Sequence, residues 1–319
     1  MRNKRLSSVF LLGLLFFVTV GSAEDNGVLT YSINSEKITV TGCLDTCPTV
    51  LKIPNEISGM PVTSIGSNAF QNSPSLTSID IPDSVTSIGG QAFWGSAIRS
   101  LDIPDSVTSI GNYAFTNSSL TSINLPNNLT EIPAGLFRGA TALTSITIPD
   151  SVISIGDEAF KDTGLTEITL PDSITLISEY AFRNVSLSEL TLPASLTTIG
   201  REAFYGGMSY ASLIIPDSVA SIGYLAFSGN YLEELVLPEG VSLHNGSINQ
   251  SIPGLCSTDN LATVVIGLKN VPNDSFVNCE GLTSVTLLDS VETLGSSAFK
   301  DTPSLTSIDI PDSVTSIGG

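Results

Sequence analysis

The stretch that decides the fold runs Leu76-Thr-Ser-Ile-Asp-Ile-Pro-Asp-Ser-Val-Thr-Ser-Ile-Gly-Gly-Gln-Ala-Phe93. Ile79 and Ile81 alternate with polar residues, which predicts a short strand with one face turned inward. The Pro-Asp-Ser that follows predicts a turn, because proline fixes φ and the Asp or Ser side chain can accept a backbone hydrogen bond. The next Val and Ile predict a second extended piece, and Ala92-Phe93 predicts a helical or 3₁₀ turn that places the ring in the core.

The same unit recurs along most of the chain. Pro74–Gly90 returns letter for letter as Pro303–Gly319, and the phenylalanine of the Ala-Phe pair recurs every 22 or 23 residues except across one gap. These phenylalanines are Phe70, Phe93, Phe115, Phe137, Phe160, Phe182, Phe204, Phe227, Phe276 and Phe299. One unit cannot bury its own apolar edge, so we expect about eleven units to stack roughly 4.8 Å apart, strand on strand.

The pattern Leu-x-x-Ile-x-Ile, followed by Pro-Asp-Ser-Val-x-Ser-Ile-Gly-x-x-Ala-Phe, resembles the BspA-like leucine-rich-repeat family. The resemblance implies a mainly β leucine-rich-repeat solenoid. Parallel strands would stack on its concave face, with short second strands and helical or 3₁₀ turns on the other side. The usual asparagine after the strand is absent, and Ser84, Ser106 and Ser151 stand near its place. For function the resemblance implies only surface adhesion or ligand recognition.

Three segments are expected along the chain. Residues 1–23 are typical of a signal peptide, with a basic start, an apolar run over Val9–Val20 and a small-residue cleavage site at Gly-Ser-Ala. Residues 24–58 predict an N-terminal cap with a β-hairpin and a degenerate first repeat. Residues 59–319 carry the repeats, with one longer coil at 238–266. This organisation predicts a secreted protein, extracellular or at the cell surface.

Two places depart from the repeat. In the longer coil, the extra residues Leu243–Ser251 are expected to bulge as a loop. The sequence stops at Gly319 in the middle of a repeat and without a polar cap, which suggests that a longer protein continues beyond it. An uncapped solenoid end exposes apolar core and a sheet edge.

The cysteines fit an oxidising compartment. Two local disulfides, Cys43–Cys47 and Cys256–Cys279, are the simplest of three connectivities. A metal site at Cys43 and Cys47 lacks two ligands, and the only histidine is His244.

Charge and missing motifs narrow the function. The net charge is −19, and loss of the three leader cations would leave −22. Such a chain repels phosphate backbones and anionic lipid, so we expect no nucleic-acid partner and no direct membrane insertion.

The sequence also lacks the common catalytic motifs. There is no G-x-S-x-G, no phosphate loop and no H-E-x-x-H, and the single histidine leaves no base for a triad. We therefore expect that the chain is not an enzyme and binds no cofactor or metal. Asp83 and Asp105 occupy a turn position that recurs along the array, which predicts a role in turn formation rather than in catalysis.

The best candidate binding surface is the outward side of the first strand of each unit. Along the array, its central position changes from acidic through hydroxyl to apolar and back. The candidate ligand-binding residues on this concave face are Asp102, Asn124, Thr147, Glu167, Thr169, Glu189, Thr191, Ile214, Glu234, Val236 and Val265. Either β-branched propensity or cover by the longer coil would also explain the apolar members.

Exposed aromatics near the Ala-Phe pairs form a second candidate. They are Trp94, Tyr113, Tyr180, Tyr205 and Tyr224. Aromatic rims suit glycan or protein contacts, whereas packing over the phenylalanine turn would give them a structural role.

Two functions from different classes fit these features. The first is a non-catalytic binding or adhesion module that presents its repeat face to a protein or glycan partner. The second is a self-associating surface-coat component joined through the open C-terminal edge. A monomer is expected unless that edge self-associates.

Overall fold

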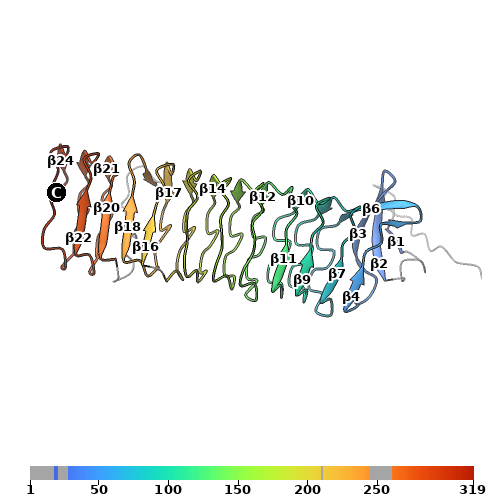
Figure 1. Cartoon of the computed structure of the whole chain (residues 1–319). Helices are drawn as coiled ribbons and strands as arrows, with labels where there is room; N and C mark the ends of the chain where they lie inside the picture. The colour runs from blue at the N-terminus through green and yellow to red at the C-terminus, as the bar shows by residue number, and fades with distance from the viewer. Residues whose placement is uncertain (1–17, 21–27, 210, 245–260) are drawn as a thin grey trace, which may run out of the picture.

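The computed structural model describes residues 18–20, 28–209, 211–244 and 261–319. Within these residues the chain forms 24 short strands and no helix. Figure 1 shows an elongated rod in which successive coils stack along one axis, from the cap at the blue end to the last coil at the red end. The predicted leucine-rich-repeat solenoid with stacked parallel strands is confirmed.

The cap is a hairpin joined to the first coil. β2 (Leu29–Asn34) and β3 (Lys37–Cys43) pair antiparallel around the turn at Ser35 and Glu36, as the sequence predicts. β1 (Val18–Val20) adds to the outer side of β2, although it lies within the predicted leader. β3 pairs in parallel with β6 (Met60–Ile65), and β6 also pairs antiparallel with β5 (Glu56–Ile57). The hairpin therefore closes one end of the solenoid sheet.

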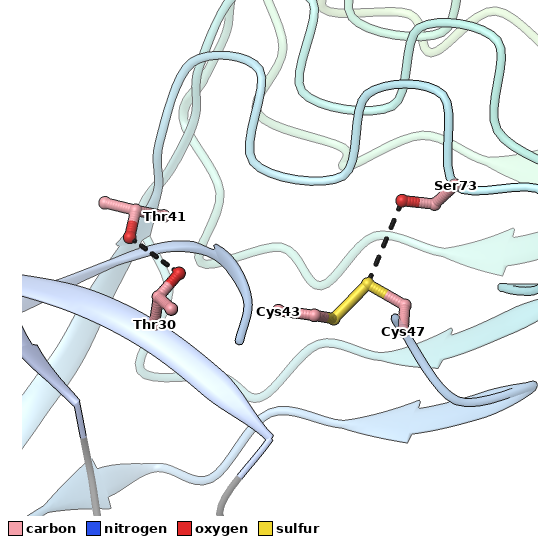
Figure 2. Close-up of a disulfide and its surroundings, with 5 residues drawn as sticks. All are labelled: Thr30, Thr41, Cys43, Cys47 and Ser73. Atoms are coloured by element: carbon pink, nitrogen blue, oxygen red, sulfur yellow. Dashed lines mark hydrogen bonds between the residues drawn. A yellow bond between two sulfur atoms is a disulfide. The ribbon is translucent and has the colours of Figure 1, made fainter. Parts of the chain in front are cut away.

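A disulfide holds the crossing from the hairpin to the first coil. Cys43 and Cys47 are bonded, and the Ser73 hydroxyl of the next coil lies 3.8 Å from the Cys47 sulfur (Figure 2). On the hairpin itself, the Thr41 hydroxyl donates to that of Thr30 at 3.0 Å. Cys279 is also disulfide-bonded, but Cys256 lies outside the described residues, so the predicted Cys256–Cys279 pairing stays a prediction.

Each coil contributes to two columns of strands. The first column, here called the strand face, contains β4 (Val50–Lys52), β7 (Ser78–Asp80), β9 (Ser100–Asp102), β11 (Ser122–Asn124), β16 (Ser212–Ile214), β18 (Glu234–Leu237), β20 (Thr263–Ile266) and β22 (Ser284–Leu287). The second column begins at β6 and continues with β8 (Ser87–Ile88), β10 (Ser109–Ile110), β12 (Glu131–Ile132), β13 (Ser154–Ile155), β14 (Leu176–Ile177), β15 (Thr198–Ile199), β17 (Ser221–Gly223), β19 (Ser242–His244), β21 (Asn270–Val271), β23 (Thr293–Leu294) and β24 (Ser316–Ile317).

The two columns are interrupted at different places. On the strand face the ladder is broken between β7 and β9 and across the coils from β11 to β16, where one isolated bridge joins Thr147 to Thr169. The second column is broken between β10 and β12 and between β19 and β21. At every described junction between neighbouring coils, at least one column keeps its parallel ladder. No pair of coils therefore relies on side-chain packing alone.

The phenylalanines of the repeats form two stacks in the core. From Phe70 to Phe227, successive ring centroids lie 5.1 to 5.8 Å apart and the planes are nearly parallel. A second stack joins Phe276 to Phe299 at 5.3 Å. The spacing follows from the distance between adjacent coils, since each ring occupies the same position in its unit. The repeat thus aligns identical side chains along the axis.

The Ala-Phe pair lies in hydrogen-bonded turns rather than in a helix. The Phe93 N–H donates to the Ala114 carbonyl of the next coil at 2.8 Å, and the Phe160 N–H donates to the Ala181 carbonyl at 2.8 Å. These bonds use N–H groups that a helix would satisfy within its own segment. The turns therefore act as a third line of coil-to-coil backbone bonding.

Serines replace the missing asparagines. The Ser106 hydroxyl donates to the Val85 carbonyl of the preceding coil at 2.8 Å, and the Ser151 hydroxyl donates to the Leu129 carbonyl at 2.7 Å. In these coils a serine hydroxyl satisfies a carbonyl of the neighbouring coil, so the bend needs no asparagine. The hydroxyl of Ser84, in contrast, is buried without a hydrogen-bond partner among the described residues.

The longer coil begins differently from its prediction. Leu243 and His244 belong to β19 and pair with β17, where a loop was expected. The physical reason is packing, since Leu243 is partly buried against the core. The remainder of the expected loop, residues 245–251, lies outside the described residues.

The phenylalanine stack gives a stability prediction. Phe160 is fully buried between Phe137 and Phe182, at centroid distances of 5.6 and 5.1 Å. Phe160→Ala should lower the free energy of unfolding by about 3–5 kcal/mol, because the cavity is lined by rigid coils. Urea unfolding followed by circular dichroism measures the loss. Ile153→Ala, in the same coil but at a side chain 50% exposed, should cost about 0.5 kcal/mol or less. Equal losses would contradict the importance of the stack.

Candidate binding face

Six of the predicted binding residues lie on strands of the strand face: Asp102, Asn124, Ile214, Glu234, Val236 and Val265. The other five, Thr147, Glu167, Thr169, Glu189 and Thr191, occupy the corresponding positions of the coils between β11 and β16, where the ladder is interrupted; the strand face is taken below to include these positions. Where the first column is paired, equivalent positions stand side by side: Asp102 opposite Asn124, and Val236 between Ile214 and Val265. The Asn124 side-chain amide donates to the Asp102 carboxylate. The repeat period therefore places outward residues that are 22 or more positions apart in the sequence next to each other.

Exposure divides this set into two groups. The exposed members are Asp102, Asn124, Thr147, Glu167, Thr169, Glu189, Thr191 and Ile214, whereas Glu234, Val236 and Val265 are half-buried. Ile214 is the most prominent apolar member, with 66% of its surface exposed. The exposed apolar patch is therefore smaller than the sequence predicts, because Val236 and Val265 are partly covered.

A shallow hollow of about 400 Å³ lies on the strand face where its ladder is interrupted. The lining residues come from four successive coils: Ser122, Ile123, Asn124, Ser145, Ile146, Thr147, Glu167, Ile168, Thr169 and Glu189. A second hollow of about 210 Å³ lies over β7, β9 and β11. Both are open depressions, lined mainly by hydroxyl, amide and carboxylate groups. They suit contact with another surface better than enclosure of a small ligand.

The carboxylates of the larger hollow have no cationic neighbour. Within the described residues, neither Glu167 nor Glu189 takes part in an ion pair, and the hollow is lined by no Lys or Arg. Glu234, further along the face, accepts a hydrogen bond from the Ser212 hydroxyl at 2.9 Å. The centre of the strand face therefore carries uncompensated negative charge.

The cations of the same coils gather around the Ala-Phe turns. Four of the nine Lys and Arg residues after the predicted leader stand there: Arg138, Lys161, Arg183 and Arg201. Glu158 accepts from Arg138 and from Lys161, each at 2.6 Å. Glu202, with a side chain 8% exposed, accepts from Arg183 at 2.7 Å and from Arg201 at 3.3 Å. Each glutamate thus neutralises part of the charge of two cations.

The predicted aromatic edge is built into this ion-pair network. Arg183 lies over the rings of Tyr180 and Tyr205, at 5.7 and 5.0 Å, and Arg201 lies over those of Tyr180 and Tyr224, at 5.9 and 5.5 Å. The hydrogen bond to Glu202 raises the pKa of Arg201, with a smaller contribution from Tyr180. Because cations lie over these rings, Tyr180, Tyr205 and Tyr224 contribute to the packing of this edge.

Tyr113 has the same packing role for a different reason. Gly135 has a φ of +61°, and a Cβ built on it would fall 2.1 Å from the Tyr113 ring. The absence of a side chain at position 135 therefore leaves space for this ring to lie against the next coil. Trp94 lies 6.3 Å from Tyr113, ring to ring.

Sequence reasoning missed the ion-pair network, although a signal was present. Arg138, Lys161 and Arg183 each directly follow the phenylalanine of their unit, and Glu158 and Glu202 each precede it by two positions. Aligning the units on phenylalanine places these charges in two adjacent columns. That alignment, read across coils rather than along one, would have predicted the pairing.

The turn aspartate Asp105 forms hydrogen bonds with the next coil. The Asp105 carboxylate accepts from the Asn127 backbone N–H at 2.8 Å and from its side-chain amide at 3.2 Å. These two hydrogen bonds lower the pKa of Asp105, and the bond from the backbone N–H contributes most.

Among the described residues, no group of three or more His, Cys, Asp or Glu side chains is placed to hold a metal ion. The described part also contains no helix of membrane-spanning length and apolarity.

Comparison with known proteins now identifies the class. The family described as the BspA type leucine rich repeat region, in six copies, matches residues 50–163, 130–253 and 255–319. The chain belongs to this family, whose members are typically protein-binding surface proteins. No curated protein matches the chain significantly.

A solved structure supports the same fold. A leucine-rich repeat protein from Bacteroides ovatus is 26% identical, with 91% of this chain and 86% of that chain covered and a TM-score of 0.67. A leucine rich cell surface protein from Faecalibacterium prausnitzii is 22% identical, covering 96% and 95%, with a TM-score of 0.48. The pneumococcal vaccine antigen PcpA is 18% identical, covering 93% and 94%, with a TM-score of 0.45.

The ion-pair network gives the second prediction. Glu202→Gln should lower the free energy of unfolding by about 1–3 kcal/mol, because Arg183 and Arg201 lose a largely buried counter-charge. Thermal and urea unfolding measure the change. The matched control is Glu292→Gln. Glu292 pairs with Lys269, and their side chains are 48% and 62% exposed, so this pair should contribute less than about 1 kcal/mol to the free energy of unfolding. A larger effect in the control would contradict the structural role of the network.

Proposed function

We propose that this chain is a secreted, non-catalytic binding module whose strand face docks a protein partner with exposed cationic side chains. The observation that carries the proposal is the distribution of charge across one set of coils. Glu167 and Glu189 are exposed and take part in no ion pair with another described residue at the larger hollow, while the cations of those coils pair with Glu158 and Glu202 at the Ala-Phe turns. A basic partner would supply the missing counter-charge.

Electrostatics favours association on this face. Like charges on adjacent coils repel one another, and a partner cation placed between them relieves that repulsion on binding. Complementary charge also steers the encounter and suppresses wrong partners, so it contributes to rate and specificity. Beside the carboxylates, Ile214 offers an exposed apolar contact at the margin of the acidic region.

A protein partner suits the hollow better than a small ligand. The depression is shallow, is lined by no aromatic side chain and extends over four coils. Pockets for small ligands are usually enclosed and mainly apolar. A glycan remains the contrasting outcome of the experiment below.

Export completes the proposal. Removal of residues 1–23 would release the chain into an oxidising compartment, which suits the Cys43–Cys47 disulfide. It would also make the net charge more negative, from −19 to −22, which keeps rods soluble and favours basic partners.

The test compares charge variants on arrays of purified extracellular-matrix proteins and purified glycans. The chain should bind a basic matrix protein, and the double variant Glu167→Gln with Glu189→Gln should weaken that binding by about tenfold or more. Raising the salt concentration should weaken the parent more than the variant. The control is Glu131→Gln with Glu292→Gln, two exposed glutamates that lie in β12 and directly before β23, away from the strand face.

Three outcomes would contradict the proposal: equal binding by the parent and the strand-face variant, equal loss in the control, or binding to neutral glycans alone. Ile214→Ser separates the apolar contribution, since it removes the exposed apolar contact without changing the charge of the face.

A further inference from the structure

We propose that the outer edge of β2 joins two copies of the processed chain head to head, by antiparallel pairing of β2 with β2 of a second copy. The proposal rests on the removal of residues 1–23 described above. It does not depend on the partner of the strand face.

The first observation is that this edge accepts a strand. β1 pairs antiparallel with β2, with Val18 opposite Ser32, Thr19 opposite Tyr31 and Val20 opposite Thr30. Those three β1 residues belong to the segment that a signal peptidase would remove. Cleavage after Ala23 would therefore take the covering strand away and leave the outer backbone groups of β2 without it.

The second observation is that the edge lacks the usual protection. Natural edge strands avoid pairing with other chains through charged residues, prolines or bulges. β2 reads Leu-Thr-Tyr-Ser-Ile-Asn, with no charge and no proline. The bulge of the hairpin lies on β3, because Thr30 faces Gly42 while Tyr31 faces Val40, which leaves Thr41 as the extra residue. β2 itself is regular over six residues.

The third observation selects a second copy as the occupant. The covering segment reads Val18-Thr19-Val20, and β2 begins Leu29-Thr30-Tyr31, so both place a threonine between two apolar residues. A β2 strand therefore offers this edge the same chemistry that already sits on it. Antiparallel pairing of identical strands also satisfies two-fold symmetry, the commonest symmetry of homo-oligomers.

The position of the edge determines the shape of the dimer. β2 lies at the cap end of the rod, beyond β3 and β6 in the order of the sheet (Figure 1). A second copy added there extends the sheet along the axis rather than across it. The dimer would be a single rod of about twice the length, with the last coils at its far ends.

Net charge sets the salt dependence. Each processed chain carries −22, so two copies repel one another at low ionic strength, and β2 itself contributes no charge. Salt screens this repulsion. The dimer should therefore strengthen as salt increases, opposite to the salt dependence proposed for the basic partner.

The experiment measures sedimentation and small-angle X-ray scattering of the chain beginning at Glu24, over a range of concentrations. A concentration-dependent dimer is expected, with a maximum dimension about twice that of the monomer. Ser32→Lys should weaken the dimer at least about tenfold, because it places like charges at the pairing edge. Ser32 is half-buried and alternates with the buried Tyr31, so lysine there has room on the outer face.

Three controls keep the result specific. Gln71→Lys adds the same charge at an exposed turn position of the first coil, outside β2, and should leave the dimer intact. A chain that begins at Phe16, and so keeps β1, should be monomeric. The strand-face variant Glu167→Gln with Glu189→Gln should still dimerise, which separates this joint from the proposed binding function. A monomer at every concentration, a dimer unaffected by Ser32→Lys, or an equal dimer with β1 retained would overturn the proposal.

Discussion

Every coil of this rod depends on backbone hydrogen bonds that only the next coil can complete. The strand ladders, the phenylalanine turns and the serine hydroxyls each send donors across the same junction. This requirement explains why the period hardly changes from 22 or 23 residues, since a coil of another length would move its donors out of register. The phenylalanine stack follows from it, because registered coils place identical rings at a fixed spacing.

The same constraint leaves the side chains at other positions free to vary, and the charged side chains at these positions fall into two groups. Positions beside phenylalanine hold cations and glutamates close enough to pair, so these charges stabilise one edge. Outward positions of the strand face lie on an open surface, where Glu167 and Glu189 keep their charge uncompensated. One side of the rod therefore uses its ionisable residues for cohesion, and the other presents them to the surroundings. The family assignment agrees with this division but names no partner.

The sequence predicted what repeats and missed what depends on three dimensions. Period and alternation were enough for the solenoid, the outward column and the cap hairpin, because these follow from local pattern. The sequence left open whether the apolar outward residues are exposed or covered, and the half-buried state of Val236 and Val265 favours cover for these two residues. The interruptions of the ladders and the pairing of Arg183 with Glu202 depend on distances between coils, which no single unit encodes.

The offset of the two ladders has a consequence for how such a chain can change in evolution. Since each junction is completed by whichever column is intact, copying or losing one whole unit leaves the bonding between coils equivalent. The recurrence of Pro74–Gly90 as Pro303–Gly319 is what a duplication of that kind would leave in the sequence. Relatives could then differ in reach by whole steps while each step kept its shape. The length of the rod would then depend on the number of repeat units, and the surface residues of each coil could change independently of those of the others.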